Sequence, residues 1–403
     1  MRGKWLIRSV SALLLLAAGT LSYAPYLPRL LAEGYPSATW PAPGSFATIA
    51  GASPRTPDET PDERAAPNSL ALDPLLAAAF DETKGRALLA SRNGVLLVEH
   101  YAPGIGRQTR LNSYSMVKSL IGALVLRAIA EGRIADASAP LGTLLPGLPG
   151  GSDAATGYPM AAMPLCRLLD MRSGIWFQPD AGRDPADAGP KDFETSKFNV
   201  LGPLARLHAG GLPAVTPRLL TSVPASQQGC GEGRYSYQNV NTAILGAVLE
   251  RAYGQPLEVL LSDKIWKPAG AQDAVWRRYD AGLPVTPYCC LYARPIDWLR
   301  VGEFLMANGT PAQPFLPDAL WRAFLGLDLK PGQRGHYSNQ VYHDLLDRAG
   351  EPLAGRFAYF MGSRGQTTYL KPDDGLVAIR FGGRMPLLHS TLYGIGRTLA
   401  ATP

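Results

Sequence analysis

The chain has 403 residues, of which 46% are hydrophobic and 18% are charged, a composition that allows a sizeable globular core. Its net charge is +6, but the basic residues are scattered and form no run interleaved with aromatic residues, so a nucleic-acid partner is not expected. The five histidines form no H-E-x-x-H motif, which argues against a zinc hydrolase.

The N-terminus has the layout of an export segment. Arg2, Lys4 and Arg8 precede a stretch of uncharged residues, 9–28, as in a secretory signal. Its apolar part is short for a transmembrane helix, whereas Pro25 should hinder cleavage after the small-residue site SYA. We therefore expect residues 1–28 to be an export signal or a membrane tether, in a protein that is periplasmic or held on the outer face of the inner membrane.

Residues 29–68 are rich in Pro, Ala, Ser and Thr, which predicts a disordered linker before the folded body. The body is expected over residues 69–403. Two strands meet at Asn93-Gly94, a strong hairpin signal. Strand-like runs return near the C-terminus, where the sequence PDDG separates two of them.

The order of these elements predicts the fold class. Strands are expected over about 69–110 and 335–403, and mostly helices and loops over about 115–330. This pattern indicates one α/β (α+β) body, in which an antiparallel sheet joins the two ends of the chain and a mostly helical subdomain is inserted between them.

The four cysteines leave their pairing open. An oxidising compartment would permit a Cys166–Cys230 disulfide, although the sequence alone does not establish it. Cys289 and Cys290 are adjacent, and we do not expect them to bond to each other. None of the four shows the spacing of metal ligands.

The main chemical signal is the segment SYSMVKSLIGALVLRAIAEG, in which Ser115 and Lys118 open an almost wholly apolar helix. Residues three apart on a helix point the same way. A serine becomes a nucleophile when a neighbouring base takes its proton, and a buried lysine can supply that help. The plain alternative is a capping serine followed by a surface lysine. However, this is the single S-x-x-K of the chain, and the G-x-S-x-G elbow does not occur.

This segment resembles the S-x-x-K serine hydrolases, which include β-lactamases and penicillin-binding proteins. That family implies a Tyr-x-Asn motif, for which the chain has two candidates. We favour Tyr237 and Asn239, which precede an apolar helix ending at Gly254. Tyr337 and Asn339 lie in a strand-like run close to the third motif, so we reject them.

The third family motif, Lys-Thr-Gly, has no direct match. Its expected replacement is Ser363-Arg364-Gly365, which lacks the lysine. By resemblance, the oxyanion hole would use the backbone N–H groups of Ser115 and Gln366. Trp176, in SGIWF, is a candidate wall of the acyl pocket, although a buried core tryptophan is an equal alternative.

The resemblance, strongest to class C β-lactamase-type and 6-aminohexanoate-dimer hydrolase-like proteins, covers about residues 87–398. It implies the β-lactamase/transpeptidase-like fold and an acyl-enzyme on Ser115, formed with help from Lys118 and Tyr237 and without a metal or cofactor. We expect hydrolysis of a small ester or amide. A D-Ala-D-Ala peptidase or β-lactamase is the second alternative, and a non-catalytic binding relative is the third.

Overall fold

The structure is a computed structural model of the chain. It describes residues 19, 22–35, 40–41, 44–52, 69–148, 151–152, 160–177, 199–216, 219–221, 229–329, 336–346, 352–387 and 389–401. Most of the predicted export segment therefore lies outside the described residues. Within the described ranges, no helix is both long and apolar enough to span a bilayer.

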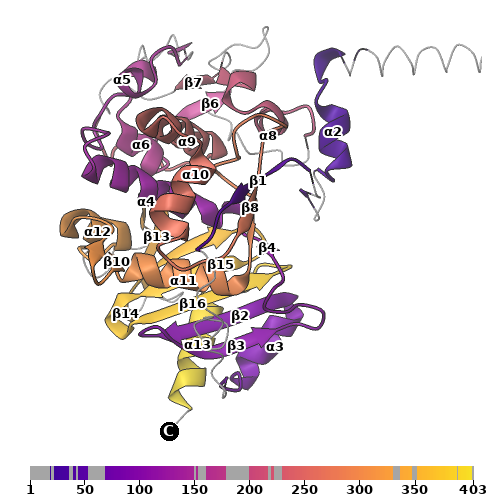
Figure 1. Cartoon of the computed structure of the whole chain (residues 1–403), viewed down its shortest axis with the longest axis vertical. Helices are drawn as coiled ribbons and strands as arrows, with labels where there is room; N and C mark the ends of the chain where they lie inside the picture. The colour runs from indigo at the N-terminus through magenta and orange to yellow at the C-terminus, as the bar shows by residue number, and fades with distance from the viewer. Residues whose placement is uncertain are drawn as a thin grey trace, which may run out of the picture.

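A seven-stranded antiparallel sheet forms the lower part of the molecule (Figure 1). In spatial order its strands are β12 (His336–Ser338), β13 (Val341–Leu346), β14 (Pro352–Gly362), β15 (Gln366–Lys371), β16 (Leu376–Gly382), β2 (Gly85–Arg92) and β3 (Val95–Tyr101). Pairing of β16 with β2 joins strands from the two ends of the body. The predicted fold class is therefore confirmed.

Helices cover both faces of this sheet. On β16, Leu376 and Ala378 pack in one core cluster with helices α3 (Pro74–Glu82) and α13 (Ser390–Ala400). The alternate residues Val377 and Ile379 belong to the main core, to which α11 (Pro295–Met306) also contributes. Successive side chains of a strand point to opposite faces, so a strand covered on both sides is apolar throughout.

The predicted hairpin joins β2 to β3. Asn93 and Gly94 have φ angles of 53° and 76°, and a type I′ turn needs positive φ at both central residues. Glycine adopts that conformation without cost, and asparagine tolerates it better than most residues. This turn sets the register in which Arg92 pairs with Val95.

The upper part is built around two buried helices, α4 (Val117–Ala130) and α9 (Asn239–Tyr253), which pack against each other (Figure 1). Of the 14 residues of α4, 11 are buried, which explains its all-round apolar sequence. Helix α9 ends at Gly254 with φ 67°, as expected for a left-handed C-terminal cap.

The remaining described elements are shorter. The helices are α5 (Leu141–Leu144), α6 (Leu165–Leu169), α8 (Pro203–Gly210), α10 (Leu257–Leu261), which continues as a π-helix (Ser262–Trp266), and α12 (Asp318–Leu325). Short 3₁₀ turns cover Met160–Ala162, Leu212–Ala214 and Pro372–Asp374. The strands are β5 (Gly151–Ser152), β6 (Ile175–Phe177) and β7 (Leu219–Thr221) in one sheet, and β10 (Gly309–Thr310) with β11 (Gln313–Pro314) in another.

The described N-terminal residues differ from the predicted linker. Helix α2 (Leu27–Ala32) and strand β1 (Phe46–Ile49) are ordered elements. Strand β1 pairs with β8 (Ala274–Arg277) in a four-stranded sheet that continues through β9 (Leu291–Ala293) to β4 (Leu111–Asn112). The linker prediction is therefore wrong for the described residues between 29 and 52, while 53–68 lie outside the described residues.

Apolar side chains spaced between the prolines account for this difference. Leu30 and Ile49 are fully buried in the main core, and Trp40 is only 8% exposed. In addition, the Glu33 carboxylate pairs with the Arg277 guanidinium at 2.6 Å in a buried site. These few buried side chains and the ion pair fix this stretch to the folded body. The overall composition of the stretch does not reveal them.

The structure contains two disulfides. Cys166 bonds to Cys230, across a sequence separation of 64 residues. Cys289 bonds to its neighbour Cys290, so the expectation that these two do not pair is wrong. Cys290 has φ 71°, so this bond occurs where the backbone is left-handed.

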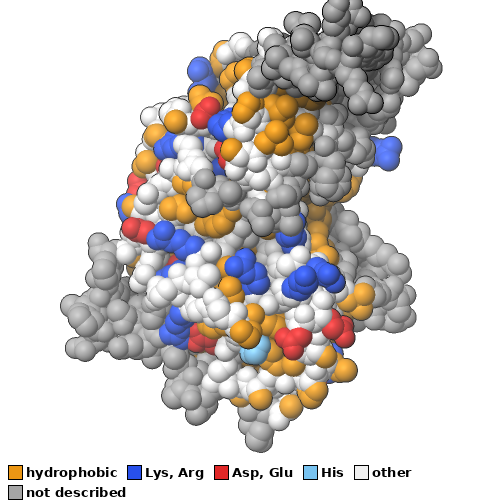
Figure 2. All heavy atoms as spheres, turned by 90° about the vertical axis from the view of Figure 1, so that its right-hand side faces the viewer, with side chains coloured by type: hydrophobic (Ala, Val, Ile, Leu, Met, Phe, Trp, Pro, Cys, Tyr) orange, Lys and Arg blue, Asp and Glu red, His pale blue; other side chains and the backbone are white. Residues whose placement is uncertain are grey.

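Seen from the right-hand side of Figure 1, the surface mixes apolar, uncharged and charged side chains (Figure 2). Several Lys and Arg side chains lie near the middle of this face, with acidic side chains below them. The basic character found in the sequence is thus dispersed among apolar and acidic groups on this side.

Candidate active site

The nucleophile candidate lies in a tight turn at the start of α4. Ser115 is the central residue of a 3₁₀ turn (Tyr114–Met116), and its side chain is partly exposed. Tyr114 has φ 46°, which is strained for a residue other than glycine. The Asn112 side chain stabilises this turn, because its Oδ1 accepts a hydrogen bond from the Tyr114 N–H at 2.9 Å.

Lys118 is 1% exposed and points at Ser115. Its Nζ donates to Ser115 Oγ at 3.0 Å, to Asn239 Oδ1 at 2.5 Å and to the Tyr288 carbonyl oxygen at 2.9 Å. A buried ammonium group is costly unless its donors are satisfied. These three acceptors explain how a lysine is held at the mouth of an otherwise apolar helix.

The second motif comes from the segment that leads into α9. Asn239 is the first residue of that helix, and the Tyr237 ring centroid lies 4.8 Å from Lys118 Nζ. The Tyr237 ring also packs against Tyr337, with centroids 6.2 Å apart, and stacks on Tyr342 at 6.5 Å. Packing of α4 on α9 therefore brings together Ser115, Lys118, Tyr237 and Asn239.

The rejected Tyr-x-Asn candidate has a different role. Tyr337 is on β12, and Asn339 follows in the turn before β13 with φ 53°. The Asn339 N–H donates to Asp170 Oδ1 at 3.1 Å, and its carbonyl lies so close to Gly122 of α4 that an added Cβ there would be 2.0 Å away. This turn packs against the first half of α4.

The glycine that approaches the nucleophile is Gly362, at the end of β14. A Cβ built on it would lie 2.2 Å from the Ser113 carbonyl oxygen and 3.2 Å from the Ser115 nitrogen. Only glycine allows this approach without displacing one backbone. The backbone that reaches Ser115 is therefore at Gly362, three residues before the expected glycine.

The Ser363-Arg364-Gly365 stretch is the turn between β14 and β15. Arg364 and Gly365 have φ angles of 70° and 81°. A Cβ on Gly365 would meet the Arg380 guanidinium at 2.5 Å, on the β16 side of the turn. The Gln366 side chain bonds to the Ser363 and Gly382 carbonyls at 2.8 and 2.9 Å, so it shapes the turn.

Arg364 brings a positive charge beside the nucleophile turn. Its guanidinium carbon lies 5.9 Å from the Tyr114 ring centroid. Burial raises the pKa of the Tyr114 phenol, while Arg364 and Arg86 act in the opposite direction. Trp176 lies on β6, and its side chain is outside the described part of the structure.

Two residues near Lys118, Tyr288 and His208, are not predicted from the sequence. Tyr288 binds Lys118 through its backbone carbonyl, which no side-chain motif can reveal. Its phenol lies 3.1 Å from His208 Nδ1. Burial, together with the charges of Arg277 and Lys118, lowers the pKa of His208 well below its usual value. The neutral imidazole therefore supports Tyr288 without adding charge.

The comparisons with known proteins agree with this geometry. A family model described as Beta-lactamase matches residues 75–289, more than half of the chain. The chain belongs to the beta-lactamase family. The matched region contains Ser115, Lys118, Tyr237 and Asn239, whereas Gly362 and the following turn lie beyond it.

One curated relative of this beta-lactamase-family chain is the 6-aminohexanoate-dimer hydrolase of Paenarthrobacter ureafaciens, which is 29% identical over 193 residues. That match covers 48% of this chain and 44% of the relative, so the chain spans less than half the length of this relative.

Solved structures share the fold. A protein of Bacillus anthracis described as a candidate 6-aminohexanoate-dimer hydrolase superposes with a TM-score of 0.65 and 19% identity, covering 89% of this chain and 90% of that one. A class C beta-lactamase of Rhodobacter sphaeroides gives a TM-score of 0.52 and 14% identity, covering 82% of this chain and 100% of that one. These identities establish the fold alone.

Proposed function

We propose that this protein hydrolyses a small carboxylic ester or amide through an acyl-enzyme on Ser115. The observation that carries the proposal is the position of Lys118, whose Nζ donates hydrogen bonds to both Ser115 Oγ and Asn239 Oδ1. A buried cation held against a serine hydroxyl, beside a tyrosine ring, is the arrangement that nucleophilic catalysis needs. The 6-aminohexanoate-dimer hydrolase relative supports the amide alternative.

In the proposed acylation step, Tyr237 acts as a phenolate held beside the Lys118 ammonium group, and it takes the proton of Ser115. The Ser115 oxygen attacks the substrate carbonyl, and the resulting intermediate collapses as its bond to the leaving amine or alcohol breaks. Tyr237 delivers a proton to that leaving group and then activates the water that releases the acid. Asn239 holds Lys118 in place through its amide oxygen.

The oxyanion would be held by two backbone N–H groups. One belongs to Ser115, at the start of α4, where the positive end of the helix dipole adds to its effect. For the second we propose Ser363 in place of Gln366, because Gly362 is the residue whose backbone approaches the Ser115 nitrogen. Gly365 lies instead against Arg380.

Arg364 is proposed to bind a carboxylate on the substrate. Its guanidinium lies beside Tyr114, the residue that precedes the nucleophile, and guanidinium groups pair with carboxylates in a bidentate manner. The Arg364→Ala variant should raise KM for an ester with a terminal carboxylate by about tenfold, the worth of one hydrogen bond between charged groups at a half-buried residue. For a neutral ester of the same length, KM should not change.

The test compares the wild-type protein with Ser115→Ala on three substrates: a p-nitrophenyl ester, the linear 6-aminohexanoate dimer and a chromogenic cephalosporin. Turnover that disappears in the variant, with unchanged circular dichroism, supports the proposal, and the preferred substrate identifies the bond. Preference for the cephalosporin would favour β-lactamase or cell-wall chemistry. Equal turnover in Ser115→Ala would remove Ser115 as the nucleophile.

We also propose that the protein is exported. The N-terminal basic residues and the uncharged stretch 9–28 are those of a secretory signal or tether. The two disulfides provide independent support, since such bonds persist mainly in oxidising compartments. Cell fractionation with N-terminal sequencing tests this: a cytosolic protein that retains Met1 would contradict it.

A further inference from the structure

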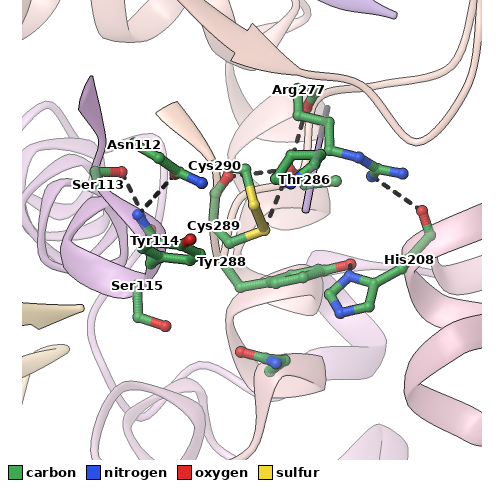
Figure 3. The surroundings of a disulfide bond; sticks show 12 residues. Asn112, Ser113, Tyr114, Ser115, His208, Arg277, Thr286, Tyr288, Cys289 and Cys290 are labelled. Carbon is green, nitrogen blue, oxygen red and sulfur yellow. Dashed lines mark hydrogen bonds between the residues drawn. A yellow bond between two sulfur atoms is a disulfide. The ribbon is translucent and has the colours of Figure 1, made fainter. Parts of the chain in front are cut away.

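The Cys289–Cys290 disulfide lies next to backbone groups that contact Lys118 and Tyr114. Figure 3 shows it between the turn that carries Ser115 and the pair formed by Tyr288 and His208. Cys289 is 6% exposed and Cys290 is fully buried. A bond between neighbouring residues closes a small ring that includes their shared peptide group, so it restricts the backbone on which it sits.

Two backbone groups next to this ring contact the catalytic residues. The carbonyl of Tyr288, just before Cys289, accepts the hydrogen bond from Lys118 Nζ at 2.9 Å. The N–H of Cys290 donates to the Tyr114 carbonyl at 3.3 Å. The ring is thus joined on one side to the lysine and on the other to the residue before the nucleophile.

The carbonyls of this loop are held by two residues of strand β8 and by Thr286. Trp276 Nε1 and Thr286 Oγ1 each donate to the Cys289 carbonyl at 3.0 Å. The Arg277 N–H donates to the Cys290 carbonyl at 3.1 Å. These contacts hold the carbonyls, whereas the left-handed φ of 71° at Cys290 needs a separate cause. An unrestrained cysteine disfavours that conformation.

We propose that the Cys289–Cys290 disulfide is a positioning element for the reaction: it holds Cys290 in its left-handed conformation and so aims the Tyr288 carbonyl at Lys118 and the Cys290 N–H at Tyr114. The inference rests on the proposed function of Ser115 and Lys118. Without the bond, Cys290 relaxes towards negative φ, and Lys118 loses an acceptor that fixes its ammonium group. The sulfur atoms take no part in the reaction itself.

The experiment compares two double variants that both lack the bond. Cys289→Ala with Cys290→Ala should lower kcat about 10- to 100-fold, the factor that corresponds to one lost hydrogen bond to a charged group, with KM nearly unchanged. Cys289→Ala with Cys290→Gly should recover most of kcat, because glycine adopts positive φ freely. A merely structural disulfide would not give this rescue.

Controls separate the inference from general destabilisation and from the proposed function. Cys166→Ala with Cys230→Ala removes the other disulfide and should leave kcat nearly unchanged. If the double alanine variant does not fold, the wild-type protein is reduced with a phosphine instead. The phosphine is oxidised to its oxide with oxygen from water, and the disulfide gains two protons and two electrons to give two thiols. Peptide mass verifies that the Cys289–Cys290 bond is open. Reduced protein with full kcat would overturn the inference. Wild type without Ser115-dependent turnover would instead overturn the proposed function.

Discussion

The approach of β14 to the nucleophile can be tested by adding one methyl group at Gly362. Its Cβ would lie 2.2 Å from the Ser113 carbonyl oxygen, whereas ordinary contact begins at 3.4 Å. The two backbones must therefore separate by about 1 Å in Gly362→Ala. A misplacement of that size at reacting groups costs about 10²-fold in rate, so we expect kcat for a p-nitrophenyl ester to fall about a hundredfold.

Gly106→Ala is the matched control, because a Cβ at Gly106 would meet nothing within 4 Å. It should keep wild-type kcat. The rate of labelling by a fluorophosphonate should follow kcat in both variants, since both depend on the same oxyanion contacts. A folded Gly362→Ala protein with wild-type kcat and labelling rate would refute the assignment of β14 as the strand beside Ser115.

Three further outcomes are expected. Lys118→Met should lower kcat about 10²–10⁴-fold, the contribution of a positioned acid–base group, in a protein that still folds, and activity within threefold of wild type would contradict this. Burial raises the pKa of Asp170 from 3.8 to about 6, so the stabilisation that comes from the protonated Asp170 carboxyl is present below pH 3.8 and is lost as pH rises through 6. In urea unfolding, the stability of Asp170→Asn relative to wild type should therefore rise by about 3 kcal/mol between about pH 3 and 7. A stability difference that stays constant with pH would exclude this titration. Glu33→Gln leaves the buried Arg277 without its carboxylate and should cost about 3–5 kcal/mol in unfolding free energy, whereas unchanged stability would place residues near 33 outside the folded body.

Local signals in the sequence predicted much of the fold. The Asn93-Gly94 turn, the buried helix after Ser115 and the helix ending at Gly254 each depend on neighbouring residues, and each occurs in the structure. The position of residues 29–52 depends instead on distant partners, such as Arg277 for Glu33. Composition contains no information about such contacts, so composition alone predicts a linker for this stretch.

The same distinction applies to the site. Ser115 and Lys118 are three residues apart, and Asn239 follows a recognisable motif, so side-chain chemistry pointed to them. The Tyr288 carbonyl and the Gly362 backbone act through groups that every residue has. Their roles come from position alone. The sequence pattern therefore favours Gly365, the more conspicuous glycine of the turn, whereas the oxyanion contact that we propose follows Gly362.

The most direct test of the account is the intact mass of the protein after reaction with a fluorophosphonate ester. The account predicts one covalent adduct on the wild-type protein, mapped to the peptide containing Ser115, and none on a folded Ser115→Ala variant. An adduct on another residue, or an equal adduct on the Ser115→Ala protein, would contradict it. The absence of any adduct on folded wild type would favour the non-catalytic binding alternative.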